Sequence, residues 1–397
     1  MKSATAITYE IDDAGEAARQ LADSIKEKLA LEKNAAGILL CDADMDALTL
    51  TRELKNILGV DIVGMTSLAT IDSSGHHEAA AVLTILTAED CGFFPAVSEP
   101  LSQGDYEAAI VKVYEETAQK AAAYGGKPGV LFVFCPSGMP FSGDRYPEIL
   151  SKAAGNAPVM GGVASDDYDY ERARVFFSGG EYRDAMVMVG VWGNIKPVFA
   201  IRHVTSRFAE RIRRVVEAEG NVVRRVGNET LVEYLEGFGL KTDVADPLLA
   251  FTSYPMMLTR DDVADEVPLM RHILSIDRET GAGAFVGDVP TGTLANICLV
   301  NKDDIKAACR DSMTALLREM ELAPDYKYST ILCISCCGRA MILGAEADAE
   351  GRILSETLPQ GISLAGAYCL GEICPARYKD GEASNRFHNC SVTFCMF

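Results

Sequence analysis

The sequence has 397 residues, of which 48% are hydrophobic, and it carries 37 Lys and Arg against 57 Asp and Glu, a formal charge of −20. The apolar content is enough for packed cores and the length favours two or three domains, which excludes a disordered tail protein. Because the negative charge repels phosphate backbones and anionic lipids, we expect no nucleic-acid partner and no binding to membrane surfaces.

The sequence shows no membrane span and no export signal. Its longest apolar runs, 129–135 and 185–192, have the length of strands and fall short of the roughly 18 residues that cross a bilayer. The first residues lead into an acidic amphipathic segment without the apolar core of a signal peptide. We therefore expect a cytoplasmic protein without membrane insertion, in which most of the twelve cysteines are reduced thiols.

The N-terminal elements follow from the spacing of apolar residues. Ala17, Leu21, Ile25 and Leu29 recur every four residues, which predicts an opening helix with acidic residues at its positive end. The next elements predicted in chain order are a strand at 37–41, a helix at 45–58 and a strand at 60–64. This alternation is typical of an α/β layer.

One pattern occurs three times along the chain: a strand that ends at glycine, a polar loop, and a returning apolar strand. It covers 63–86, 158–192 and 363–397. The strands that precede the second and third occurrences, 129–138 and 330–338, also match each other. Repeats at such long spacing predict an internal duplication: two related α/β halves with mixed sheets, with an α+β arrangement as the alternative. The Arg-rich segment between Arg202 and Gly227 is the expected join.

The C-terminal motifs occur in a recognisable order. They are Ser335-Cys336-Cys337-Gly338-Arg339, Leu343-Gly344, Glu356, Ala365-Gly366, Gly371-Glu372-Ile373-Cys374-Pro375 and Phe387-His388-Asn389. Together they resemble the FIST family, which pairs an N-terminal with a C-terminal FIST domain and serves as an intracellular sensory module for small ligands. The N-terminal half agrees with this resemblance at 62–67, at 161–166 and in the hairpin that ends at Trp192.

The resemblance implies a domain division and a signalling role. It predicts an N-terminal helical extension at 1–34, a FIST N-type domain at 35–226 and a FIST C-type domain at 227–397. Because these two domains fill the chain, we expect the output to pass in trans to a signalling protein of kinase, cyclase or chemoreceptor type.

The N-terminal half carries one departure from the family pattern. Gly64-Met65-Thr66-Ser67 stands where the family commonly has Gly-Cys-Ser/Thr-Thr. A pocket in this half would therefore have lost or changed its ligand. Its candidate residues are Gly64, Thr66, Gly162 and Asp166.

The C-terminal half offers a candidate ligand site at its strand ends, where polar groups from separate segments can converge. The guanidinium of Arg339 could hold a carboxylate and Glu372 could hold an ammonium, which together would suit an amino acid or a related metabolite. Alternatively, Arg339 and Glu372 form a structural ion pair with each other. The candidate residues are Ser335, Cys336, Arg339, Gly371, Glu372, His388 and Asn389.

His388 leaves three interpretations open. As a neutral imidazole it could ligate haem iron, and family members that bind haem and sense nitric oxide make a haem sensor an alternative function. It could instead deprotonate Cys336, which would make the protein a Cys/His-dependent enzyme. The third interpretation is a histidine bonded to the backbone beside Asn389. We find no complete catalytic constellation in the sequence, so we expect a binding protein without a resident cofactor.

The cysteines gather toward the end of the chain, with seven of the twelve between Cys333 and Cys395. Cys333 and Cys336 have the C-x-x-C spacing of zinc and redox sites. Residues three apart in a strand point to opposite faces, so this pair would not converge on a metal. We therefore expect most of the cysteines to be small core residues.

Overall fold

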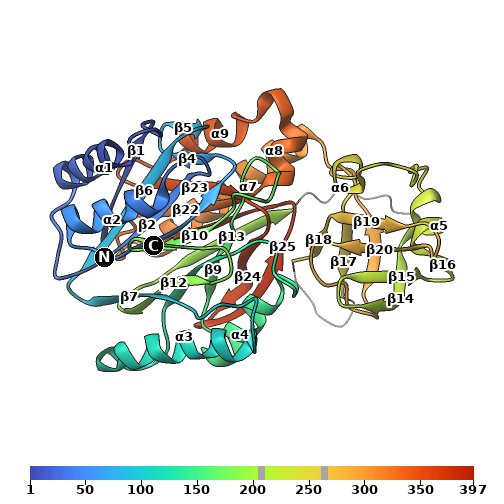
Figure 1. Ribbon diagram of the computed structural model, residues 1–397, viewed down its shortest axis with the longest axis horizontal. Coiled ribbons are helices and arrows are strands. Elements are labelled where there is room, and N and C mark those ends of the chain that lie inside the picture. The colour runs from blue at the N-terminus through green and yellow to red at the C-terminus, as the bar shows by residue number, and fades with distance from the viewer. Residues whose placement is uncertain (204–210, 261–266) are drawn as a thin grey trace.

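The computed structural model describes residues 1–203, 211–260 and 267–397 (Figure 1). Its main body combines the chain up to residue 203 with the chain from residue 298 onward. Residues 211–260 and 267–297 form a smaller β-rich unit beside the body, which we call the inserted domain. The α/β class with mixed sheets that the sequence predicts is confirmed. In the described part of the chain, no helix is long and apolar enough to cross a membrane.

The body consists of three successive units, each with the order strand, helix, strand, helix, strand, hairpin, strand, and the third unit has one further short helix after its second strand. The first unit contains β1 (Lys2–Thr8), α1 (Ala14–Lys28), β2 (Asn34–Asp42), α2 (Ala47–Leu58), β3 (Ile62–Ser67), β4 (Thr70–Asp72), β5 (Gly75–His77) and β6 (Ala81–Ala88). The second contains β7 (Cys91–Val97), α3 (Tyr106–Lys120), η1 (Ala122–Tyr124), β8 (Val130–Cys135), α4 (Arg145–Ala153), β9 (Val159–Val163), β10 (Val175–Phe177), β11 (Gly180–Tyr182) and β12 (Val187–Gly193).

The third unit is interrupted by the inserted domain. It begins with β13 (Val198–His203), and after the insertion it continues with α7 (Lys302–Leu322). Its remaining elements are β22 (Thr330–Cys336), α8 (Cys337–Leu343), η3 (Gly344–Glu346), α9 (Ala349–Thr357), β23 (Ser363–Cys369), β24 (Glu372–Lys379), β25 (Glu382–His388) and β26 (Ser391–Met396). The three units correspond to the three occurrences of the sequence pattern, so the strand pairing resolves the predicted repeat into three parts.

Each unit forms one sheet and completes it with a hairpin from another unit. The first sheet has the order β1-β6-β2-β3-β10-β11, the second β7-β12-β8-β9-β24-β25, and the third β13-β26-β22-β23-β4-β5. Within each sheet the two central strands are parallel, as in β2 with β3, and the strands beside them are antiparallel. The exchanged hairpins tie the N-terminal and C-terminal parts of the chain into one body.

A glycine recurs at the same place in the second parallel strand of each sheet. A Cβ atom at Gly64 would lie 1.8 Å from the Leu39 carbonyl oxygen, so only glycine allows this close approach of the two strands. This close approach explains the glycine that recurs in the sequence pattern, although each glycine lies inside its strand and not at the strand end that the pattern predicts. The three pairs are Gly64 opposite Leu39, Gly161 opposite Val133, and Gly366 opposite Cys333.

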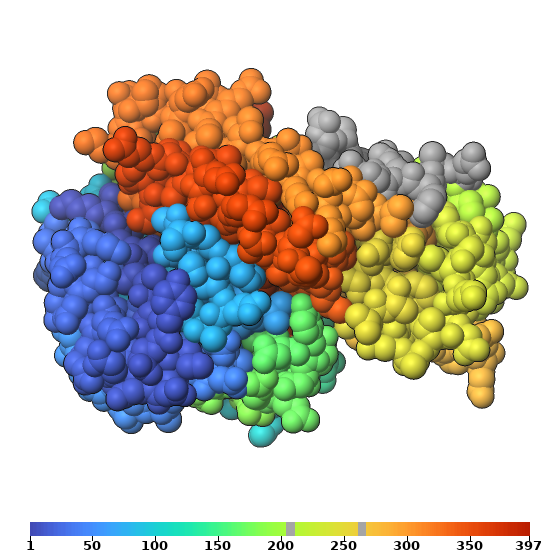
Figure 2. Space-filling model, turned by 90° about the horizontal axis from the view of Figure 1, so that it is seen from above, coloured from blue at the N-terminus to red at the C-terminus, as the bar shows by residue number. Residues whose placement is uncertain are grey.

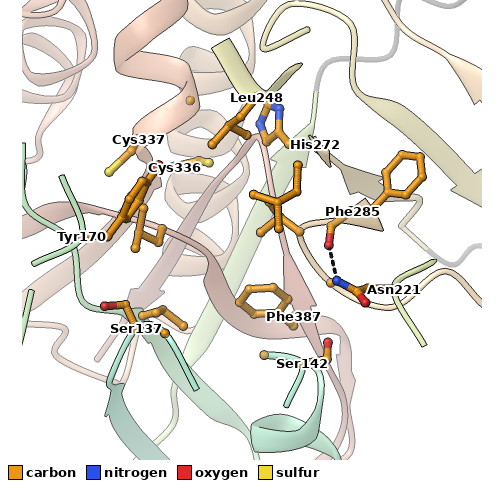
Figure 3. A pocket seen from close by; sticks show the side chains of 18 of the residues that line it. Ser137, Ser142, Tyr170, Asn221, Leu248, His272, Phe285, Cys336, Cys337 and Phe387 are labelled. Carbon is orange, nitrogen blue, oxygen red and sulfur yellow. Dashed lines mark hydrogen bonds between the residues drawn. The ribbon is translucent and has the colours of Figure 1, made fainter. Parts of the chain in front are cut away.

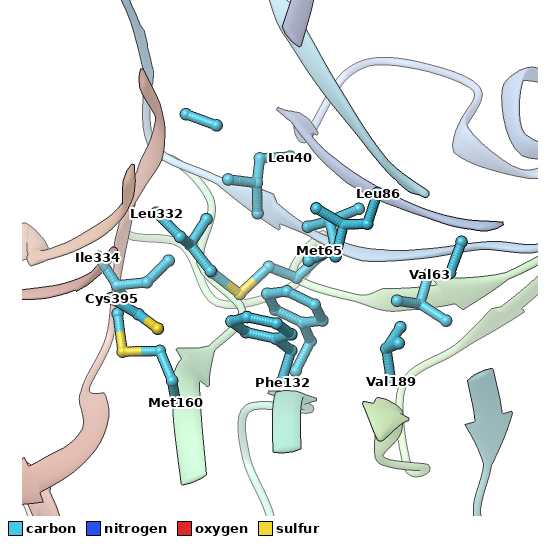
Figure 4. Packing of buried hydrophobic residues seen from close by; sticks show 14 of the residues in the cluster. Leu40, Val63, Met65, Leu86, Phe132, Met160, Val189, Leu332, Ile334 and Cys395 are labelled. Atoms are coloured by element: carbon cyan, nitrogen blue, oxygen red, sulfur yellow. The ribbon is translucent and has the colours of Figure 1, made fainter. Parts of the chain in front are cut away.

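The inner faces of the three sheets pack against one another in a shared hydrophobic core (Figure 4). The helices cover the outer faces: α1 and α2 on the first sheet, α3 and α4 on the second, α7 and α9 on the third. Strands buried on both faces explain the continuous apolar runs in the sequence. The core residues labelled in Figure 4 include Leu40 and Met65 of the first sheet, Phe132 and Val189 of the second, and Leu332 and Ile334 of the third.

Helix boundaries follow from local capping. The Asp13 carboxylate accepts from the backbone amide of Glu16 and begins α1, and the Asp46 carboxylate accepts from that of Thr49 and begins α2. Helix α2 ends at Gly59, which has a φ of 67° that favours glycine.

Residues 1–34 differ from the predicted helical extension. They contain α1, as the apolar spacing predicts, but also β1, which pairs with β6 along its whole length from Lys2 opposite Thr87 to Thr8 opposite Ala81. The prediction of a separate extension is wrong because β1 is an edge strand of the first sheet and α1 packs against that sheet.

The inserted domain has its own β-sheet and core. In its described residues, eight strands form a single sheet, which packs on a hydrophobic cluster that includes Tyr234 and Phe285. On the face shown in Figure 2, the domain (yellow) lies against the C-terminal unit (orange and red). Its elements are β14 (Arg213–Glu219), β15 (Val222–Val226), β16 (Glu229–Thr230), α5 (Leu231–Glu236), α6 (Pro247–Ala250), β17 (Met256–Thr259), β18 (Leu269–Arg271), β19 (Ile273–Asp277), β20 (Ala282–Phe285) and β21 (Leu294–Ile297).

Candidate functional site

A pocket of about 290 Å³ lies where the inserted domain meets the body (Figure 3). The body contributes the loop that follows β8, the loop that follows β9, and the start of α8. The inserted domain contributes α6, β19 and β20 with the loop that follows. The ends of strands in an α/β sheet and the junction of two domains are both places where ligand sites commonly form.

The pocket is lined mainly by aromatic and aliphatic side chains. Among the described residues that line it, none is Asp, Glu, Lys or Arg. The polar groups are few: hydroxyls, the amide of Asn221, the imidazole of His272, and the thiols of Cys336 and Cys337. The aromatic lining residues are Phe141, Tyr146, Tyr168, Tyr170, Phe285 and Phe387.

The loop after β8 is held against the body by aromatic packing. Phe141 stacks on Tyr106 at 4.0 Å between ring centroids and meets Tyr146 edge to face at 5.3 Å. A Cβ atom at Gly143 would lie 2.7 Å from the Phe387 ring, so glycine lets this loop reach the end of β25. These contacts fix one wall of the pocket.

Ion pairs join the two sides of the pocket. Arg271 of the inserted domain is fully buried, and its Nη2 donates to Asp144 Oδ1 of the body at 2.7 Å. Its Nη1 donates to the Phe387 carbonyl at 3.1 Å, and Arg145 of the body pairs with Asp288. The two sides are therefore connected directly beside the lining residues Phe387 and Gly287.

His272, next to Arg271, is the most distinctive polar group of the lining. It is 4% exposed, and neither ring nitrogen has a hydrogen-bond partner among the described residues. Burial lowers the pKa of His272 to about 4, so the ring is neutral near pH 7. A Cβ atom at Gly338 would lie 2.8 Å from His272 Nε2, so the glycine at the start of α8 makes room for this ring.

Cys336 is the one predicted site residue that lines the pocket. Burial raises the pKa of the Cys336 thiol well above its usual value and raises that of Cys337 to about 12. A catalytic cysteine needs the opposite shift. The thiols are therefore protonated near pH 7, which does not support the enzyme interpretation.

His388 does not fit the role of a haem ligand. It is fully buried outside the pocket lining, and its Nε2 lies 3.1 Å from the Cys374 carbonyl oxygen. Its ring packs against His203 at 5.4 Å between centroids. The backbone-bonded histidine that the sequence left open is the arrangement in the structure: Nε2 lies beside a carbonyl oxygen and Nδ1 is buried, so neither nitrogen faces the pocket. Asn389 beside it donates its side-chain amide to the His388 carbonyl at 2.9 Å.

Arg339 forms a buried ion pair with Glu350, so the alternative interpretation, a structural pair between Arg339 and Glu372, does not hold. Nη2 of Arg339 donates to Glu350 Oε1 at 2.7 Å, both side chains are fully buried, and Ser335 Oγ donates to Glu350 Oε2 at 3.1 Å. Neither Arg339 nor Glu372 lines the pocket. Sequence reasoning missed this partner because Glu350 lies on α9, a helix the pattern did not indicate.

Glu372 has its own buried environment. Ser391 donates to its Oε2 with both the hydroxyl, at 2.6 Å, and the backbone amide, at 3.2 Å. Burial raises the pKa of Glu372 to about 8. Gly371, just before it, approaches the Phe387 ring so closely that a Cβ atom would lie 2.2 Å from Cζ. Gly371 thus packs against the Phe387 ring of the pocket wall, and Glu372 follows it at the start of β24.

The N-terminal candidates hold the backbone in place. Gly64 and Gly162 allow close strand contacts, and Thr66 Oγ1 donates to the Ser165 carbonyl at 2.9 Å. The Asp166 carboxylate accepts from three backbone amides, including that of Tyr170 at 3.0 Å. Asp166 thereby orders the loop that carries Tyr168 and Tyr170 into the pocket.

In the described part of the chain, no group of three or more His, Cys, Asp or Glu side chains could hold a metal ion. All twelve cysteines are buried, as expected for small core residues, and none of them forms a disulfide bond in the structure.

Both halves of the chain match known domain families. Residues 8–229 match the FIST N domain, and residues 229–375 match the FIST C domain. The chain belongs to the FIST family. FIST domains are sensory domains of signal transduction, and the resemblance carried by the C-terminal motifs is confirmed. The two FIST domains share the pocket, since the loops after β8 and β9 lie in the N domain and α6, β19, β20 and α8 lie in the C domain.

No curated protein matches this FIST chain. Among solved structures, it is similar to cyanuric acid hydrolase, described as evolutionary innovation by structural concatenation, with a TM-score of 0.30 and 11% identity over 76% of this chain and 100% of that one. It is also similar to T. maritima PurL complexed with AMPPCP, with a TM-score of 0.21 and 10% identity over 99% of this chain and 72% of that one. At these scores neither similarity bears on function.

Most lining residues of the FIST pocket escaped sequence reasoning. His272 is a single histidine between short strands of the inserted domain, with no motif around it. A signal did exist in the N domain: the Pro136-Ser137-Gly138 turn follows a buried strand, and loops at such strand ends often carry sites. Which of these loops meets the inserted domain depends on tertiary packing.

Proposed function

We propose that this FIST protein is a cytoplasmic sensor that binds a small molecule in the pocket between its FIST N and FIST C domains. One observation carries the proposal: an aromatic pocket whose walls come from both domains and from both sides of the junction. A ligand there contacts the body and the inserted domain at once, so its binding energy depends on their arrangement.

Signal output follows from the same geometry. A ligand shifts a conformational equilibrium only by its differential affinity for the two states. We propose two states that differ at the junction, where Arg271 and Asp144 join the inserted domain to the body beside the pocket. We propose that a separate signalling protein of kinase, cyclase or chemoreceptor type recognises the ligand-stabilised arrangement.

Two neighbouring leucines of α6 allow a matched test. Leu248 lines the pocket, whereas Leu249 is 61% exposed and does not. Native mass spectrometry of freshly purified protein would show a retained ligand as added mass, and a thermal-shift screen of metabolites would find ligands that were lost. We expect Leu248→Trp to abolish both signals and Leu249→Trp to keep them.

The comparison of wild type with Leu248→Trp decides whether the pocket binds the ligand. Equal ligand retention and equal thermal shifts in wild type and Leu248→Trp would overturn the pocket as the sensory site. Near-UV circular dichroism of both variants checks that the tryptophan has not disturbed the fold.

A further inference from the structure

The charge of the pocket lining contrasts with that of the whole protein. The chain has 57 acidic and 37 basic residues, yet none of the described lining residues is Asp, Glu, Lys or Arg. A charged ligand would lose part of its hydration in this pocket without gaining an ion partner from the lining, which is unfavourable. The lining therefore selects against carboxylates, ammonium groups and the amino-acid zwitterion.

The size and walls of the pocket indicate a compact planar ligand. A cavity of roughly 150 Å³ accommodates one benzene ring. The pocket of about 290 Å³ therefore has room for one or two fused rings. Figure 3 shows Tyr170 and Phe387 on different sides of the central space, where their rings can pack against such a molecule.

Two buried polar groups of the lining have no hydrogen-bond partner among the described residues. They are the His272 imidazole, with both nitrogens, and the Tyr146 hydroxyl, in side chains that are 4% and 1% exposed. Buried polar groups are normally bonded, so such exceptions are expected where a ligand supplies the bond. A neutral imidazole offers one donor and one acceptor.

We infer that the sensed ligand is an uncharged planar molecule of one or two rings whose amide, carbonyl or hydroxyl group hydrogen-bonds to His272. The inference rests on the proposed function, because it names the ligand class of the same pocket. The aromatic walls provide the affinity for the ring, and His272 selects the molecules that carry a hydrogen-bonding group.

Three probes that share one ring system isolate the effect of charge. They are 2-naphthamide, which is neutral, 2-naphthoate, which is anionic, and 2-naphthylmethylamine, which is cationic. We expect calorimetry and ligand-observed NMR to show that wild type binds 2-naphthamide at least ~30-fold more tightly than either charged probe, because the lining offers neither charge an ion partner.

Substitutions at His272 isolate the hydrogen bond. His272→Phe keeps a ring and removes both nitrogens, and we expect ~5- to 10-fold weaker binding of 2-naphthamide. His272→Gln keeps a donor and an acceptor and should restore part of the affinity. Because the His272 nitrogens make no bond within the described protein, His272→Phe should not lower the thermal unfolding midpoint.

The results distinguish this inference from the proposed function. Failure of 2-naphthamide to bind, equal or tighter binding of a charged probe, or unchanged affinity in His272→Phe would overturn the ligand class. The pocket would remain the sensory site in those cases if Leu248→Trp still abolished retention of the native ligand. Binding of 2-naphthamide that Leu248→Trp does not weaken would instead contradict the proposed pocket itself.

Discussion

The first and second sheets of the body end in the same backbone pattern, yet only the second borders the pocket. In the first sheet the Thr66 amide donates to the Arg174 carbonyl at 2.9 Å, and in the second the Val163 amide donates to the Gly371 carbonyl at 3.0 Å. Arg174 and Gly371 therefore hold equivalent positions, each just before the hairpin that completes the sheet. Arg174 has a long basic side chain, whereas Gly371 has no side chain.

The Arg174 side chain occupies the space beyond the first sheet. Its Nη2 donates to the carbonyl oxygens of Ala43 and Met45, both at 2.9 Å, and its Nε lies 3.0 Å from a Glu181 carboxylate oxygen. At Gly371 the neighbouring side chain is the Phe387 ring, which lines the pocket. A repeated scaffold thus provides the same strand ends several times, and the side chains before the hairpins help to determine where a cavity remains.

The largest effect is expected at the buried ion pair of the third unit, which joins α8 to α9. Arg339→Ala leaves the Glu350 carboxylate buried without its partner, so we expect the free energy of unfolding to fall by about 3–5 kcal/mol in urea titrations. The double variant Arg339→Met/Glu350→Leu removes both charges and should recover most of this loss. A single variant with near wild-type stability would show that the ion pair does not support this region.

The sequence predicts the repeat and part of the pocket wall, because both depend on local patterns. Glycine at 64, 161 and 366 and the apolar strands around it are local signals, so the α/β repeat was visible. The pairing of β24 with β9 joins segments about 200 residues apart and leaves no local pattern. The position of His272 over α8 depends on how the inserted domain docks, which only the three-dimensional structure shows.

A substitution at the end of the first sheet should reduce stability by a smaller amount, and a neighbouring arginine provides the control. Arg174→Ala leaves the Ala43 and Met45 carbonyls without their donor, and we expect a loss of about 2 kcal/mol in the free energy of unfolding. Arg172 lies two residues away and makes exposed ion pairs with Asp167 and Asp169, so Arg172→Ala should cost clearly less. Equal losses in the two variants would argue against Arg174 as the residue that fills this strand end.

The first residue of the hairpin that completes each sheet is ionisable in the second sheet alone of the three. Val175 in the first sheet and Thr70 in the third have no ionisable group at the position where the second sheet has Glu372. Burial raises the pKa of Glu372 to about 8, so between its ordinary pKa and about pH 8 the folded protein holds a proton that the unfolded chain has lost. Raising the pH through this range therefore favours unfolding.

Glu372→Gln removes the titrating group and keeps an oxygen that can accept from Ser391. We expect wild type to lose stability relative to this variant by at most about 1.4 kcal/mol per pH unit from about pH 5 to about pH 8, with no further change above that range. Urea titrations of both proteins across this range measure the difference. Parallel stability curves would mean that Glu372 is already ionised in the folded protein, and the second sheet would then carry a buried charge directly behind the uncharged pocket wall.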